Sequence, residues 1–131
     1  MFKPILIGAL LLSPATAAFA QTCLHGSSET AGERMRREQA ITFARQLNAA
    51  EQAAAGLGAR RGYRPLNELP NVPRIPAGFT LKLQTDGAGY IFSVKDTRDP
   101  CGFAVFSDQD GDVYVATPAP HQATVVPLDT R

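Results

Sequence analysis

Three aspartates at alternate positions, Asp108, Asp110 and Asp112, are the residues of this chain that come closest to a chemical site. Carboxylate oxygens at such spacing are ligands of the kind that Ca²⁺ prefers. An EF-hand loop, however, has a bidentate Glu at its twelfth position, and counting from Asp108 this position is Ala119. Because Asp110 is followed by Gly111, the segment also suits a tight turn between strands. We therefore predict a hairpin turn, with a calcium site as the alternative.

The sequence contains no combination of side chains typical of an enzyme. His25 and His121 lie in no zinc-protease motif and in no catalytic-triad context. None of the serines stands in a G-x-S-x-G turn, and no glycine-rich phosphate-binding loop is present. We expect no catalytic residues and a protein that is not an enzyme.

The chain has two cysteines, Cys23 and Cys101, far apart in the sequence. An even number of cysteines in an exported protein favours a disulfide, and closing a loop of this length restricts the unfolded chain by about 4 to 5 kcal/mol on the entropic account. The spacing differs from C-x-x-C and no histidine is adjacent, so we expect neither a redox site nor a zinc site.

The N-terminus has the order of features of a secretory signal peptide. Lys3 precedes an apolar run over residues 5–12, and small residues lead to an A-x-A site at residues 18–20. This run is far shorter than the ~20 residues that span a bilayer, which argues against the alternative of a retained membrane anchor. We predict a signal peptide over residues 1–20, a periplasmic or secreted protein of residues 21–131, and no membrane span after cleavage.

Composition and charge favour one soluble globular domain. The chain has 131 residues, 44% of them hydrophobic, with 13 Lys and Arg against 12 Asp and Glu. Its most basic segment, Arg34, Arg36 and Arg37, is interleaved with Glu33 and Glu38. This favours a solvated helix face over a site for an anionic polymer, and we expect no nucleic-acid partner.

The first half of the mature chain is expected to be helical. Thr30 and Glu33 form a capping box, and apolar residues then recur at steps of three and four as far as two glycines, Gly56 and Gly58. The prediction is a helix over about residues 29–56. A proline-rich connector follows over residues 60–78, attached to the core by apolar residues every third position: Tyr63, Leu66, Leu69, Val72 and Ile75.

From residue 79 the hydrophobic period changes from helical to two. Apolar and polar residues alternate in residues 79–84 and 90–95, and two further short strand segments follow at residues 103–106 and 113–116; turn-forming residues separate the four. We predict a four-stranded antiparallel meander over residues 79–117 and an irregular tail over residues 118–131, in which at most residues 124–126 add an edge segment. One long helix followed by such a sheet is a single α+β domain over residues 21–131.

The order of these features resembles the globular head domain of bacterial type IV pilin-like (pseudopilin-like) proteins. The resemblance covers roughly residues 40–117, but the N-terminal hydrophobic helix of that family is missing here, and an ordinary secretion signal stands in its place. The resemblance implies a long helix against an antiparallel sheet and a disulfide that fixes the C-terminal region, and it implies no active site. The motifs that carry it are Arg45-x-Leu47-Asn48-x-Ala50-Glu51, Gly62-Tyr63-x-x-Leu66-x-x-Leu69, Gly89-Tyr90-x-Phe92 and Phe106-Ser-Asp-Gln-Asp-Gly111.

Two functional hypotheses follow. The first is an exported, non-catalytic, pilin-like protein that acts through contacts with a protein partner, linked to a type IV pilus or a type II secretion apparatus. The alternative is a small secreted ligand-binding or inhibitor module, with calcium dependence through the three aspartates. An exposed apolar patch on the outer sheet face would favour the first, and a concave polar pocket would favour the second.

Overall fold

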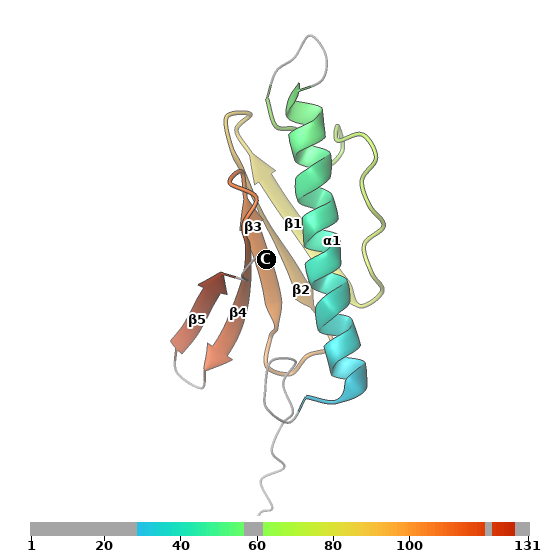
Figure 1. Cartoon of the computed structure of the whole chain (residues 1–131), viewed down its shortest axis with the longest axis vertical. Helices are drawn as coiled ribbons and strands as arrows, with labels where there is room; N and C mark the ends of the chain where they lie inside the picture. The colour runs from blue at the N-terminus through green and yellow to red at the C-terminus, as the bar shows by residue number, and fades with distance from the viewer. Residues whose placement is uncertain (1–28, 57–61, 120–121, 128–131) are drawn as a thin grey trace, which may run out of the picture.

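The protein is one helix packed on one face of an antiparallel sheet (Figure 1). The computed structural model describes residues 29–56, 62–119 and 122–127. The strands lie side by side in chain order, β1-β2-β3-β4-β5, and every neighbouring pair is antiparallel. The predicted α+β class is confirmed. The elements are α1 (Ala31–Gly56), β1 (Phe79–Thr85), β2 (Tyr90–Asp96), β3 (Ala104–Asp108), β4 (Val113–Ala119) and β5 (Gln122–Pro127).

The helix begins where the capping box places it. The Thr30 backbone N–H donates to Glu33 Oε2 at 2.6 Å, and the Glu33 N–H donates to Thr30 Oγ1 at 3.3 Å. One face of α1 then packs on the sheet and lies closest to β3 and β4. No described helix is long and apolar enough to cross a membrane. The buried apolar residues of α1 are Ala40, Ile41, Phe43, Ala44, Leu47 and Ala54.

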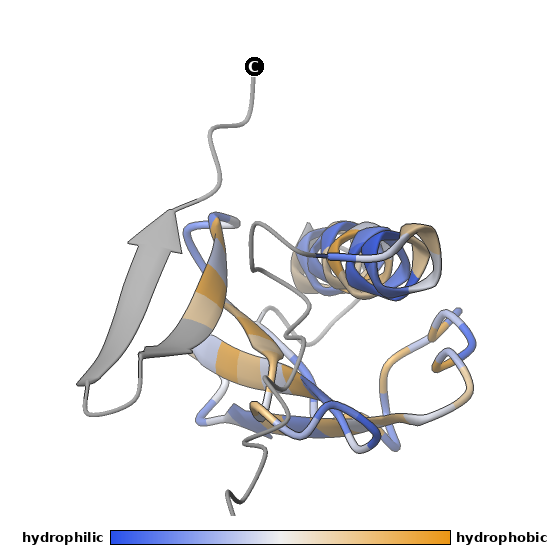
Figure 2. Cartoon of the chain, turned by 90° about the horizontal axis from the view of Figure 1, so that it is seen from below, coloured by the Kyte–Doolittle hydropathy of each residue, from blue (hydrophilic) through white to orange (hydrophobic). Residues whose placement is uncertain are grey.

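Alternation along the strands divides the sheet into two faces. Phe92 and Val94 on β2, Val105 on β3, and Val113 and Val115 on β4 are all buried against the helix. Seen from below, the helix lies on one side of the sheet only (Figure 2). The intervening residues of each strand therefore point away from the helix, and they form the second face of the sheet.

The connector runs alongside α1 without forming a helix or strand between residues 62 and 78 (Figure 1). Leu69 is buried, whereas Ile75 is 37% exposed, so the prediction that Ile75 attaches the connector to the core is wrong. At the start of the connector the Tyr63 N–H donates to Gly87 O at 3.0 Å. Gly62 has a φ of 128°, and a Cβ there would lie 2.7 Å from Gly87 O, so this close approach requires glycine.

The predicted four-stranded sheet and irregular tail need correction, because the sheet has a fifth strand. β4 continues to Ala119, and β5 pairs with it along its length. The prolines of this region argued against strands because they donate no ladder hydrogen bond. However, β3 pairs with β4 only as far as Ala116, so Pro118 lies where β4 has one neighbour, and Pro127 lies in the last strand of the order. At both positions the proline nitrogen, which carries no hydrogen to donate, can therefore face the side of the strand that has no neighbour.

Several sequence predictions fall on residues outside the described ranges. These are the signal peptide over residues 1–20, His25, His121 and Cys23. The signal peptide and the export that it implies therefore stay predictions.

Candidate functional site

The three aspartates lie in the turn between β3 and β4. The Gly111 N–H donates to Asp108 O at 2.9 Å, and the Asp110 N–H donates to Asp108 Oδ1 at 3.0 Å. Gly111 has a φ of 82°, the left-handed conformation that such a turn requires. The predicted hairpin turn is confirmed.

The alternative of a calcium site is not supported. Within residues 29–56, 62–119 and 122–127 there is no group of three His, Cys, Asp or Glu side chains that could hold a metal ion. One oxygen of Asp108 is used to order the turn, and Asp110 and Asp112 are not gathered around a common centre with it. Alternate spacing in the sequence does not create a metal site unless the loop curls its side chains inward, as an EF-hand loop does.

A buried hydrogen-bond network joins this turn to the helix. Asn48 Nδ2 donates to Ser107 Oγ at 2.7 Å and to Gly111 O at 3.0 Å. The Tyr90 hydroxyl donates to Asn48 Oδ1 at 2.8 Å, and Ser107 Oγ donates to Asp112 O at 2.5 Å. Asn48, Ser107 and Tyr90 are all buried. The network therefore sets the position of the turn relative to α1.

Tyr90 is also packed among aromatic rings. Its centroid lies 4.7 Å from that of Tyr63 in an edge-to-face arrangement and 6.1 Å from that of Phe92. Burial raises the pKa of Tyr90 to about 12. The phenol is thus protonated in the physiological pH range and serves as a hydrogen-bond donor to Asn48.

Glu51 is a fully buried carboxyl group one helical turn after Asn48. Its Oε2 accepts the Arg64 backbone N–H at 3.1 Å, whereas Oε1 has no hydrogen-bond partner. Burial raises the pKa of Glu51, and the contact with Arg64 partly offsets this effect. Sequence reasoning identified neither Asn48 nor Glu51 as a buried polar residue; the available signal was their position on the apolar stripe of the helix.

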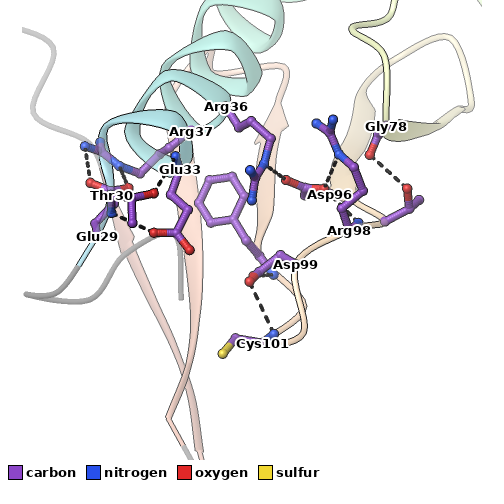
Figure 3. Close-up of polar contacts among 12 residues, drawn as sticks. Glu29, Thr30, Glu33, Arg36, Arg37, Gly78, Asp96, Arg98, Asp99 and Cys101 are labelled. Atoms are coloured by element: carbon purple, nitrogen blue, oxygen red, sulfur yellow. Dashed lines mark hydrogen bonds and ion pairs between the residues drawn. The ribbon is translucent and has the colours of Figure 1, made fainter. Parts of the chain in front are cut away.

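At the opposite end of the sheet, Asp96 anchors the loop that leads into β3 (Figure 3). Its side chain is completely buried and forms an ion pair with Arg36, with Oδ2 at 3.0 Å from Nε. Asp96 Oδ1 accepts the Arg98 backbone N–H at 2.8 Å. In the same loop, Asp99 accepts the Phe103 N–H at 2.6 Å and the Cys101 N–H at 3.3 Å. These carboxylates therefore have structural tasks.

The predicted disulfide involves this loop. Cys101 carries no free thiol, whereas Cys23 lies outside the described residues. The pairing of Cys23 with Cys101 therefore stays a prediction.

The arginines at the start of α1 are paired with carboxylates, Arg37 with nearby ones and Arg36 with one on β2. Arg37 Nε lies 2.9 Å from Glu29 Oε1, and another nitrogen of Arg37 lies 3.2 Å from Glu38 Oε1. The hydrogen bond from Arg37 to Glu29 raises the pKa of the guanidinium. Arg36 is held by Asp96. The predicted solvated helix face therefore holds for Arg34, whose side chain is 65% exposed, whereas Arg36 and Arg37 are half-buried in ion pairs.

The sheet face opposite the helix is one of the described surfaces that expose a large apolar side chain; the surface of α1 at Met35 is another. We call this sheet face the outer face and define it by the outward residues of β1 to β3, with Asp112 and Tyr114 at β4. Ile91, in its centre, is 55% exposed and lies beside the half-buried ring of Phe106 in one hollow. The residues of the outer face are Thr80, Lys82, Gln84, Ile91, Ser93, Lys95, Ala104, Phe106, Asp108, Asp112 and Tyr114.

Two shallow hollows meet on the outer face at Gln84 and Ile91. The smaller, of about 190 Å³, is lined by Lys82, Ser93 and Phe106 among others. The larger, of about 480 Å³, lies between the two hairpin turns and reaches Asp86 and Asp108. Backbone N–H groups of Gly89 and Ala88 donate to the Asp86 carboxylate and lower its pKa.

Negative charge gathers at one corner of the outer face. Burial raises the pKa of the Tyr114 hydroxyl, and the carboxylates of Asp112, Asp108 and Asp110 raise it further. These three aspartates therefore act as a common source of negative potential beside Tyr114.

Comparison with family models, with curated proteins and with solved structures finds no match to this chain.

Proposed function

We propose that this chain is an exported, non-catalytic, pilin-like protein that acts through protein–protein contacts, in association with a type IV pilus or a type II secretion apparatus. The observation that carries the proposal is the outer face, a sheet surface with Ile91 exposed at its centre and with no described helix over it. Large apolar side chains at the centre of a polar-rimmed surface are typical of protein contact sites.

Two further features support the proposal. The arrangement of one long helix on an antiparallel meander agrees with the architecture that the resemblance implies. The buried polar residues, Asn48, Asp96 and Asp99 among them, hold turns and loops in place, and none of those in the described ranges belongs to the outer face. The proposal includes the signal peptide over residues 1–20, the Cys23–Cys101 disulfide and a periplasmic or secreted location.

A second candidate is a secreted ligand-binding or inhibitor module. The hollow of about 480 Å³ between the hairpin turns favours it, because polar groups of Gln84, Asp86 and Gln109 line an open concavity.

The test is affinity capture from the native envelope fraction with the exported protein as bait. Ile91→Lys places a charge at the centre of the outer face, and Ala49→Lys is the matched control on the exposed side of α1. We expect the wild type and Ala49→Lys to recover pilus or secretion components, identified by mass spectrometry, and Ile91→Lys to lose them. Recovery of no such component by the wild type would refute the proposal.

A further inference from the structure

The outer face has a charge polarity that runs diagonally across the sheet. Lys95 pairs in register with Ala104, whereas Ile91 pairs with Asp108, so Lys95 and Asp108 lie at opposite ends of the β2–β3 pair. Four residues separate these two levels, which corresponds to about 13 Å along a strand. Lys82, on β1, pairs with Ser93, which is two residues from Lys95 on β2. The two lysines are therefore diagonal neighbours on the outer face.

The acidic corner lies diagonally opposite the lysines. Asp108 ends β3, and Asp112 immediately precedes β4 on the same face as Tyr114. Lys82, Lys95 and Asp112 are exposed, and Asp108 is half-buried. The lysines therefore occupy one corner of the outer face and the aspartates the other.

Apolar side chains occupy the diagonal between the two charged corners. Lys82, Ser93, Phe106 and Tyr114 lie opposite one another on the four neighbouring strands β1 to β4. Ile91 lies two residues from Ser93 on β2, at the level of Asp108, and is therefore the diagonal neighbour of Phe106. Ile91 and Phe106 both line the smaller hollow. The surface is thus arranged as a lysine corner, a diagonal with Ile91 and Phe106 in its centre and the exposed Asp86 at its turn end, and an aspartate corner.

Apart from the turn end, where the two Asp86 carboxylates would approach each other, this arrangement is complementary to itself. When two copies face each other across a two-fold axis that lies along the Ile91–Phe106 diagonal, the apolar side chains of one copy meet the same side chains of the other. The lysine corner of each copy then lies over the aspartate corner of its partner, with Lys82 toward Asp108 and Lys95 toward Asp112. An isologous interface requires such a match of a surface with its own rotated image.

We propose that the outer face binds a second copy of this chain, face to face, to give a two-fold symmetric dimer with the two helices on its outside. The inference deepens the proposed function, on which it rests, by naming a partner for the surface that carries that function. Two sheets packed in this way form a sandwich with an apolar centre and charged margins.

The test is a charge-exchange cycle on Lys95 and Asp112, for which no side-chain contact within the described chain is seen. Protein exported from the full chain is studied by sedimentation equilibrium, and non-reducing gels confirm that no intermolecular disulfide is present. We expect Lys95→Glu and Asp112→Lys to raise the dimer dissociation constant by about tenfold each, since each change acts twice in a symmetric interface. The double variant should restore dimerisation, and added salt should weaken the wild-type dimer.

Arg45→Glu is the matched control, because it makes the same charge change on the exposed side of α1. It should leave the dissociation constant unchanged. A wild type that stays monomeric at millimolar concentration, or a double variant no better than the single variants, would overturn the inference. A monomer that still captures pilus or secretion components would refute the dimer alone, whereas a dimer that captures none would refute the proposed association alone.

Discussion

Replacing Asn48 by alanine should destabilise the fold more than any exposed substitution on α1. The change removes the donor to Ser107 Oγ and to Gly111 O and the acceptor of the Tyr90 hydroxyl. Ser107 keeps its bond to Asp112 O, but the half-buried Gly111 carbonyl and the buried Tyr90 hydroxyl each lose their bond to Asn48. At about 1 to 1.5 kcal/mol for each of these two groups, together with the cavity left by the side chain, the loss is about 3 kcal/mol.

This loss can be measured by thermal and urea denaturation of the oxidised protein. For a domain of roughly 100 residues, about 3 kcal/mol corresponds to a fall in Tm of about 12 to 24 °C. Gln46→Ala is the matched control, because Gln46 is an exposed amide residue on the same helix and is not part of this network. It should cost less than about 1 kcal/mol.

Tyr90→Phe tests the same network from the other side, since it removes the hydroxyl and leaves Asn48 Oδ1 without this donor. Combined with Asn48→Ala, it should cost clearly less than the sum of the two single changes, because the shared bond is lost only once. If Asn48→Ala costs less than about 1 kcal/mol, or if the two changes are additive, the network does not hold the β3–β4 turn and the reasoning fails.

Three further predictions concern ionisable groups. Burial raises the folded-state pKa of Glu51 above the ordinary glutamate value of 4.5. The stability of the wild type should therefore fall as the pH rises from 4.5 through the raised pKa. Glu51→Gln should lack this fall when both proteins are denatured across a series of pH values. Asp96→Ala should lower the free energy of unfolding by about 2 to 4 kcal/mol in urea denaturation, because it leaves Arg36 and the Arg98 N–H without their buried acceptor. Asp110→Ala, at an exposed turn position, is the control and should cost under about 1 kcal/mol. Millimolar Ca²⁺ should leave Tm unchanged, because the three turn aspartates are not grouped around a common centre; a calcium-dependent rise in Tm would contradict this.

Local sequence signals were sufficient for most of the secondary structure. The bonds between Thr30 and Glu33 form within one helical turn, and the alternation of apolar and polar residues in β1 and β2 reflects the two-residue repeat of a strand. The Asp110-Gly111 turn likewise depends on residues adjacent in the chain. Each signal involves a few neighbouring residues, and no knowledge of distant contacts is needed.

The fifth strand was missed because its formation depends on the sheet and not on its own residues. Pro118 and Pro127 lower strand propensity locally. They are tolerated where a strand has a neighbour on one side only, and that condition is set by where β3 stops pairing with β4.

By itself, the sequence determined the order of helix and meander, the helix start, the position of the β3–β4 turn and the prediction of export, since each depends on residues close together in the chain. Only the tertiary structure decided which polar residues are buried, because Asn48 and Asp96 meet partners about 60 residues away. It also decided the outer face, since strand register alone places Lys95, Ile91 and Asp108 on one surface in that order. Register is a long-range property of paired strands, and shifting it by one residue would turn these side chains to the opposite face.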